Sequence, residues 1–165
     1  METLTLAFPP RASNLSLMHD AAKPGVRILV VDDDPSILEC FKLLLEHDGH
    51  TVQTARDGEA ALALLAERKF ELVFTDFSMP GMHGDKLVAR IHELVPGQRI
   101  IMATAFAQEL KVFGKGHGLV DAYLCKPFSF SELQETIEAV LASDQQALSA
   151  ASQQVQQNLP NQRAS

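Results

Sequence analysis

The chain has 165 residues, of which 46% are hydrophobic, a length that suits one globular domain with a buried core and leaves little for a second. Its formal net charge of −7 and the lack of a Lys/Arg cluster argue against binding of nucleic acid through a broad basic surface. No apolar run is long enough to span a membrane and no secretory signal pattern is present, so we expect a cytoplasmic protein without a membrane partner.

The two cysteines predict neither a disulfide nor a metal site. Cys40 and Cys125 each lie inside an apolar run, and they form no CxxC pair. Free cysteines in such runs are most often small buried side chains, so we expect both in the core of a protein from a reducing compartment.

The two ends of the chain differ in composition from its middle. Residues 1–25 show no sustained hydrophobic period, and residues 143–165 are dominated by Gln, Ala, Ser and Asn. We therefore expect flexible tails over residues 1–25 and 143–165 and one folded domain over residues 26–142.

Within that domain, short apolar runs alternate with longer segments that carry apolar residues at helical spacing. Helix starts are marked by Asp34 before Pro35, by Asp57, and by a capping box of Ser129 and Glu132. The expected strands cover residues 27–31, 51–55, 71–75, 99–103 and 122–125, and the fourth of five expected helices covers residues 108–118.

Several of the strands, such as ILVV and LVF, are apolar without alternation. Strands of this kind are covered by helices on both faces, which predicts an α/β fold with a doubly wound parallel sheet of five strands. Ligands of such sheets bind beyond the carboxyl ends of the strands. The apolar helix stripes expected to face the core are Ile37, Leu38, Phe41, Leu44 and Leu45; Leu87, Val88, Ile91, Leu94 and Val95; and Leu133, Ile137, Val140 and Leu141.

Polar residues follow four of the five strands, on the edge where ligands are expected. They are Asp32, Asp33 and Asp34 after the first strand, Asp76 after the third, Thr104 after the fourth and Lys126 after the fifth. Asp34 is explained as a helix cap. Adjacent carboxylates that face a third across two strands repel one another unless a cation lies between them, and hard oxygen ligands with retained waters suit Mg²⁺.

Lys126 and Thr104 add a cation and a hydroxyl to this edge, which together could bind a tetrahedral anion. A central carboxylate can attack phosphorus and form an aspartyl phosphate that such groups stabilise. Asp76 is the candidate nucleophile, and the sequence therefore indicates phosphoryl transfer.

Four segments, ILVVDDDPSIL, LVFTDFSMPGMHG, IIMATA and AYLCKPF, resemble the successive motifs of response-regulator receiver domains of two-component signalling. Each motif alone is weak evidence, but all four in order within one βα repeat are specific. The resemblance covers Arg27 to about Leu141 and implies a flavodoxin-like fold with strand order 2-1-3-4-5.

The resemblance also implies a role for each matching residue. Asp76 is the phosphoacceptor, Asp33 a direct Mg²⁺ ligand, Asp32 a ligand acting mainly through water, and the carbonyl of Ser78 a further ligand beside Asp76. Thr104 is the switching hydroxyl, Ala105 its small neighbour, Tyr123 the aromatic switch residue, and Lys126 the ion-pair partner, followed by a cis Lys126–Pro127 peptide.

A receiver domain is a signalling switch and not an enzyme in the usual sense, although it can remove its own phosphoryl group. The resemblance implies a sensor histidine kinase or histidine phosphotransfer protein as donor, docking beside the helix around Ser36 to Leu44. Because no domain-sized segment follows Leu141, we expect a single-domain regulator that acts on an unknown downstream protein by contact. We expect a monomer, with a homodimer on phosphorylation as the alternative.

Two other interpretations remain. Asp32, Asp34 and Ser36 resemble the DxDx(T/V) motif of haloacid-dehalogenase phosphatases, with Asp32 as nucleophile and Asp34 as acid/base, but Ser36 departs from the motif and no later acidic pair completes it. A receiver-like module that signals without phosphate is the second, and the presence of every acidic-pocket residue argues against it.

Overall fold

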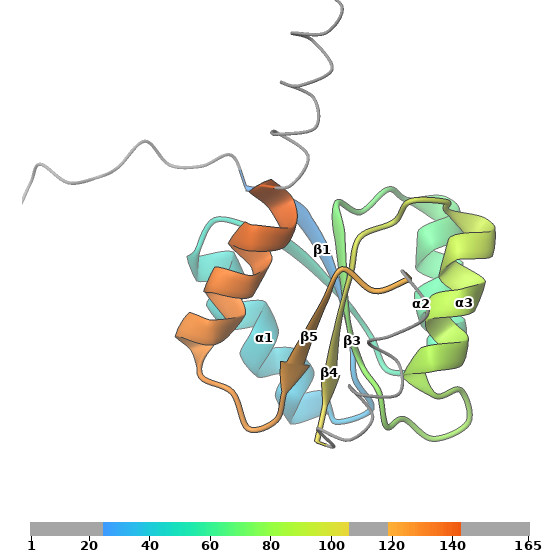
Figure 1. The fold of residues 1–165 in the computed structure, drawn as a ribbon, viewed down its shortest axis with the longest axis horizontal. Helices are drawn as coiled ribbons and strands as arrows, with labels where there is room; N and C mark the ends of the chain where they lie inside the picture. Colours follow the sequence, from blue (N-terminus) through green and yellow to red (C-terminus); the bar gives the residue numbers. More distant parts are fainter. Residues whose placement is uncertain (1–24, 106–118, 143–165) are drawn as a thin grey trace, which may run out of the picture.

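The computed structural model describes residues 25–105 and 119–142 of the chain. They form a five-stranded parallel sheet with the strand order β2-β1-β3-β4-β5, flanked by helices on both faces (Figure 1). The doubly wound fold and its strand order are therefore as predicted. The elements are β1 (Arg27–Val31), α1 (Pro35–His47), β2 (Thr51–Ala55), α2 (Gly58–Glu67), β3 (Leu72–Asp76), α3 (Gly84–Leu94), β4 (Ile100–Thr104), β5 (Ala122–Cys125) and a final helix over residues 130–142.

Each face of the sheet has its own buried core. On one face α1 and the final helix lie side by side over the sheet, and Phe41, Phe74 and Phe128 contact one another there, with 4.7 Å between the ring centroids of Phe41 and Phe74 (Figure 1). On the other face α2 and α3 cover residues such as Leu29 and Met102. Burial on both faces explains why these strands lack alternation.

The predicted helix starts are confirmed. Asp34 caps α1 by accepting a hydrogen bond from Ser36 N–H at 2.8 Å, and Asp57 caps α2 by accepting one from Ala60 N–H at 2.8 Å. At the final helix, Glu132 accepts from the backbone N–H of Ser129 and donates its own N–H back to Ser129 Oγ, as in a capping box.

Two strands end one residue later than predicted. β3 runs to Asp76 and β4 to Thr104, because parallel pairing continues through the pairs Asp76–Ala103 and Thr104–Cys125. Polar residues at strand ends resemble loop residues in sequence, and the ladder that includes them depends on the neighbouring strand.

The prediction of buried cysteines was wrong, since both Cys40 and Cys125 are exposed. Cys40 lies two positions after the buried Leu38, on the opposite side of α1, and Cys125 follows the buried Leu124 in a strand whose side chains alternate. The helix stripes were also drawn too wide: Leu44 and Leu94 are 37% and 46% exposed, while Ile37, Val95 and Leu141 are half-buried.

The predicted tails over residues 1–25 and 143–165 and the helix over residues 108–118 lie outside the described residues, apart from Gly25. Among the described helices, none is both long and apolar enough to cross a membrane.

Candidate functional site

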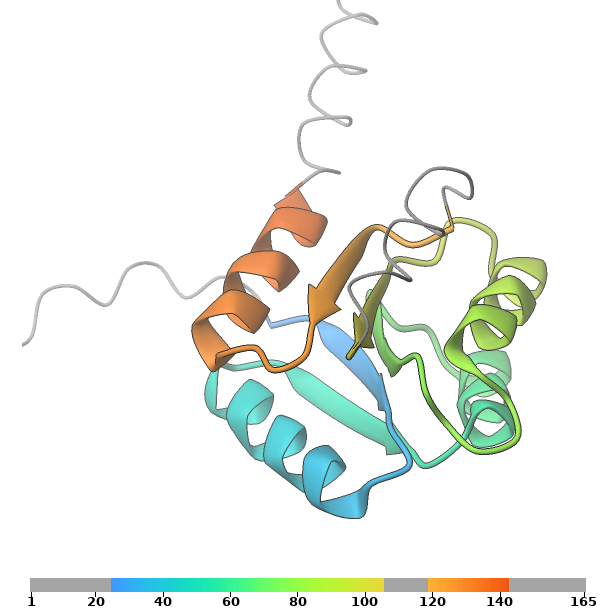
Figure 2. The ribbon, with the colours of Figure 1, turned by 60° about the horizontal axis from the view of Figure 1, so that its bottom comes forward.

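The carboxyl ends of the strands form the lower edge of the sheet in Figure 1, and Figure 2 turns this edge toward the viewer. β1 lies between β2 and β3 although β2 follows it in the chain, so the strand order reverses beside β1. Asp32 directly follows β1, and Asp76 is the last residue of β3. Since Val31 pairs with Thr75, the two carboxylates are neighbours at this switch point.

Lys126 joins the two aspartates. Its ammonium Nζ lies 2.8 Å from Asp76 Oδ1 and 3.5 Å from Asp32 Oδ2. Lys126 follows β5, and its backbone N–H donates to the carbonyl of Thr104 at 2.7 Å, which holds the lysine against the end of β4. The Lys126–Pro127 peptide is cis. The structure thus brings together Asp32, Asp76 and Lys126, as the sequence predicted.

Both aspartates are buried, with 3% of Asp32 and 7% of Asp76 exposed. Burial raises the pKa of Asp32 and the charge of Asp76 adds to this, although a hydrogen bond from Asp34 N–H and the charge of Lys126 act in the opposite direction. Burial disfavours the charged form of Lys126, but its hydrogen bond and charge interaction with Asp76 and its proximity to Asp32 raise its pKa overall. The site therefore holds more negative charge than one lysine compensates.

The loop after β3 is built around Asp76. The backbone N–H of Ser78 donates to Asp76 Oδ2 at 3.2 Å, and Met79 beside it is 2% exposed and anchors the loop in the core. Gly84, the first residue of α3, donates its N–H to the carbonyl of Phe77 at 2.9 Å. A Cβ on Gly84 would lie 2.6 Å from the carbonyl oxygen of Asp76, so only glycine allows α3 to begin this close.

Gly84 was missed in the sequence analysis. Its signal was present in the segment LVFTDFSMPGMHG, whose last glycine lies three residues before Leu87, the first residue of the apolar stripe of α3. The close approach to the backbone of Asp76 that makes this glycine necessary depends on the tertiary structure.

The predicted switch residues Thr104 and Tyr123 lie on β4, which neighbours the strand of Asp76, and on β5, the next strand along the sheet. Thr104 is 2% exposed at the end of β4, and Ala105 after it is exposed. Tyr123 on β5 pairs with Met102 and is half-buried against the core under α2 and α3. Burial raises the pKa of the Tyr123 phenol.

The other two aspartates of the first loop differ from Asp32. Asp33 is exposed, and Asp34 is exposed with Oδ1 hydrogen-bonded to Ser36 N–H as the cap of α1. The N–H of Asp34 in turn donates to Asp32 Oδ1 at 2.9 Å, which orients the buried carboxylate. Asp34 is thus explained by helix capping, as predicted.

The donor set fits Mg²⁺. In the part of the chain that the structure describes, no three His, Cys, Asp or Glu side chains are grouped closely enough to enclose a metal ion by themselves. Mg²⁺ does not need such a cage, because it commonly binds one or two carboxylates and retains several waters. Asp32 and Asp76 are buried oxygen donors with uncompensated charge, and the exposed Asp33 borders them.

Comparisons with known proteins agree with this geometry. Residues 28–138 match the family model of the response regulator receiver domain. The transcriptional regulatory protein ZraR of Salmonella typhimurium is 41% identical over 118 residues, which is 71% of this chain and 26% of that protein. The DNA-binding response regulator MtrA of Mycolicibacterium smegmatis is 36% identical over 70% of this chain and 50% of its own length. The chain thus spans from about a quarter to half of such curated relatives.

A solved structure of similar fold is the response regulator TrrA of Thermotoga maritima in complex with Mg²⁺-BeF, with a TM-score of 0.64 and 35% identity, covering 70% of this chain and 98% of TrrA. The chemotaxis protein CheY4 of Vibrio cholerae has a TM-score of 0.65 and 32% identity, covering 71% and 99% of the two chains. With the family model matched over most of the described domain, this chain belongs to the response regulator receiver domain family.

Proposed function

We propose that this domain accepts a phosphoryl group on Asp76 and uses the resulting charge to change its contacts with other proteins. Receiver domains are signalling domains of two-component systems and not classical enzymes, and this chain shares their fold and motifs. The observation that carries the proposal is the environment of Asp76. One carboxylate oxygen faces Lys126 Nζ at 2.8 Å and the other faces Ser78 N–H at 3.2 Å, beside the buried Asp32.

In the proposed step a carboxylate oxygen of Asp76 attacks the phosphorus of a phosphohistidine on a kinase or phosphotransfer protein. The new O–P bond forms as the N–P bond breaks, and the departing imidazole takes a proton from solvent. Lys126 and the N–H of Ser78 already face the carboxylate, so they are placed to stabilise the charge that moves onto it.

Asp32, Asp33, Asp76 and the carbonyl of Ser78 would hold Mg²⁺, and the TrrA structure contains Mg²⁺ with BeF. The bound ion supplies positive charge that offsets the repulsion between the carboxylates and the incoming phosphoryl group. Asp32 is buried at the end of β1, while Asp33 faces solvent, from which the donor would arrive.

We infer that Thr104 and Tyr123 transmit the change. A phosphoryl group adds close to two negative charges at the strand edge, which attracts the Thr104 hydroxyl past the small Ala105. Tyr123, half-buried on the neighbouring strand, then moves inward behind it. Moving a population from mostly inactive to mostly active takes roughly 5 kcal/mol of differential stabilisation, within reach of a few charge-assisted hydrogen bonds.

The donor protein would bind beside α1, near the site. Here Leu43 is 61% and Leu44 37% exposed, and Cys40 is exposed between them and the start of the helix. An exposed apolar strip on the helix that begins directly after Asp32, Asp33 and Asp34 suits a histidine kinase or phosphotransfer protein. We further propose that the protein is cytoplasmic and acts through contacts with other proteins. Its folded domain would cover residues 26–142, with a tail on each side. Before phosphorylation the protein would be a monomer.

Intact mass spectrometry after incubation with acetyl phosphate and Mg²⁺ tests the proposal. The wild-type protein should gain one phosphoryl group, and Asp76→Asn should gain none. Asp34→Asn is the matched control, because Asn also caps helices and the residue lies in the same edge. Labelling that persists in Asp76→Asn, with the phosphoryl group on Asp32, would support the phosphatase interpretation instead, because Asp32 is the nucleophile in that interpretation.

A further inference from the structure

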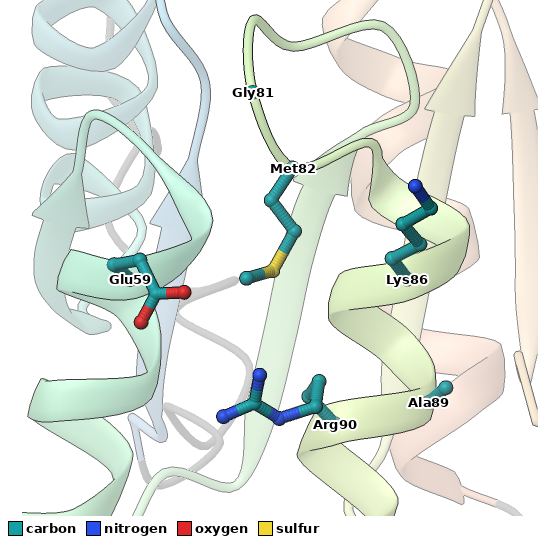
Figure 3. Close-up of a pocket in the computed structure, with 6 residues that line it drawn as sticks. All are labelled: Glu59, Gly81, Met82, Lys86, Ala89 and Arg90. Carbon is teal, nitrogen blue, oxygen red and sulfur yellow. The ribbon is translucent and has the colours of Figure 1, made fainter.

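A second surface lies on the opposite side of the loop that follows β3. It is a groove of about 580 Å³ between α2 and α3, and Figure 3 shows the residues that line it: Glu59, Gly81, Met82, Lys86, Ala89 and Arg90. None of them belongs to the proposed phosphorylation site. The volume falls within the range of sites that bind ligands or side chains of partners.

The groove has an apolar floor and a basic wall. Met82 extends between the two helices, and Ala89 lies on the α3 side (Figure 3). Lys86 and Arg90 come from α3, with the Arg90 guanidinium reaching toward α2, while Glu59 lies on the first turn of α2. Two cations and one carboxylate give this groove a positive balance in a chain whose net charge is −7.

Both cations are available to a partner. Lys86 is exposed and forms no ion pair with any residue that the structure describes. Arg90 contacts Glu93 at 3.9 Å, with 55% and 75% of the two side chains exposed. An exposed pair of this kind contributes little free energy, so it can be exchanged for a partner's carboxylate.

The spacing of the cations indicates the shape of the partner. Lys86 and Arg90 are four residues apart on one helix face, roughly 6 Å along the axis at 1.5 Å per residue. Carboxylates four residues apart on a second helix have the same spacing. A helix lying along the groove could therefore place acidic side chains against both cations and an apolar side chain against Met82 and Ala89.

We propose that the α2–α3 groove binds an acidic amphipathic helix of another protein. A second copy of this chain fits less well. Its final helix exposes Glu132 and Glu135, but the apolar stripe of Leu133, Ile137 and Val140 is already buried in its own core. That helix has no free apolar anchor for the groove.

Two synthetic peptides of about five helical turns, roughly 18 residues, provide the probe. One carries Leu at helical spacing with Glu at flanking positions, and the other has Lys in place of every Glu. Because the protein is acidic overall, general charge attraction would favour the Lys peptide. In ¹H–¹⁵N spectra at low salt we expect the Glu peptide to bind at least about tenfold more tightly and to shift the amide signals of Met82, Ala89 and Arg90.

Reversing the charges of Lys86 and Arg90 tests whether these two residues bind the Glu peptide. Lys86→Glu/Arg90→Glu should weaken the Glu peptide about tenfold or more and reverse the preference between the peptides. Arg68→Glu/Lys69→Glu, which changes the same charge at exposed positions beyond the end of α2, should leave the preference for the Glu peptide in place. The proposal fails if the Glu peptide does not shift these signals, if both peptides bind equally, or if the two double variants behave alike. Sedimentation showing self-association that Lys86→Glu/Arg90→Glu abolishes would assign the groove to a second copy and overturn it as well.

Discussion

At the scale of single residues, Lys126 determines how two buried carboxylates can share one site. Asp32 and Asp76 lie at the ends of adjacent strands, and their mutual repulsion contributes to the raised pKa of Asp32. Lys126 Nζ reaches both, which offsets part of this repulsion before any phosphoryl group arrives. The lysine thus stabilises the unphosphorylated domain as well as facing the acceptor oxygen.

Removing the ammonium should expose this dual role. In Lys126→Met the two carboxylates lose their cation, and we expect the free energy of unfolding at neutral pH to fall by about 1–3 kcal/mol. Mg²⁺ should restore more stability to the variant than to the wild type, because its binding replaces the lost charge. Urea unfolding with and without Mg²⁺ measures both, and Lys42→Met, at an exposed position of α1, is the control. Equal Mg²⁺ stabilisation of Lys126→Met and wild type would contradict this role.

At the scale of elements, the packing of α3 against the end of β3 fixes the backbone of the acceptor. A Cβ at Gly84 would meet the Asp76 carbonyl oxygen at 2.6 Å and the Phe77 Cα at 2.9 Å. A Cβ at Gly58, in the first turn of α2, would instead meet the Met82 sulfur at 2.6 Å. A flexible side chain can move aside, whereas a strand backbone within a ladder cannot.

Two glycine substitutions should therefore differ. Gly84→Ala is expected to destabilise the domain by about 1–3 kcal/mol and to slow labelling by acetyl phosphate, because the Asp76 backbone must shift. Gly58→Ala should change stability by less than about 1 kcal/mol, since the gain in helix propensity offsets the displacement of Met82. Thermal unfolding and labelling rates measure both. A Gly84→Ala variant as stable and as rapidly labelled as Gly58→Ala would show that α3 does not constrain the acceptor.

The start of β1 is tied to the start of β2 by a titratable group. His50 Nδ1 accepts the backbone N–H of Val26 at 3.3 Å, so the imidazole must be neutral at this nitrogen. Burial lowers the pKa of His50, although the charge of Asp48 acts in the opposite direction. In the unfolded chain the His50 imidazole has its ordinary pKa of about 6.5. It therefore binds a proton at a pH at which the imidazole of the folded domain stays neutral.

The free energy of unfolding should consequently decrease as the pH falls from the ordinary histidine pKa to the lower pKa of His50 in the folded domain. Asn at position 50 offers an acceptor oxygen that does not titrate, so His50→Asn should lose less stability than wild type over this window. Urea unfolding at about pH 7.5 and about pH 5 measures the difference. The proposed role of His50 would be contradicted if the free energy of unfolding of the wild type decreased no more than that of His50→Asn.

The elements also show how far the sequence predicts this domain. Periodicity, capping residues and the order of polar strand ends were sufficient for the strand order, the helix starts and the grouping of Asp32, Asp76 and Lys126. The predictions that were wrong concern features that depend on tertiary contacts. Exposed positions within apolar runs, such as Cys40, depend on which side of the helix meets the sheet, and the last residue of a strand depends on its neighbour's ladder.

At the scale of the whole molecule, the two faces of the sheet offer different surfaces around one loop. The α1 side exposes Leu43, and the α2–α3 side has the basic groove at Met82. Asp76, Ser78 and Met82 belong to consecutive parts of the same chain segment, from the end of β3 to the start of α3. A charge placed on Asp76 thus acts at a point that both faces adjoin.

The most direct test is to locate the phosphoryl group. After incubation with acetyl phosphate and Mg²⁺, borohydride reduces an acyl phosphate and converts the phosphorylated aspartate to homoserine, which peptide mass spectrometry detects. We expect homoserine at position 76 alone. Homoserine at Asp32, or at any aspartate other than Asp76, would contradict it.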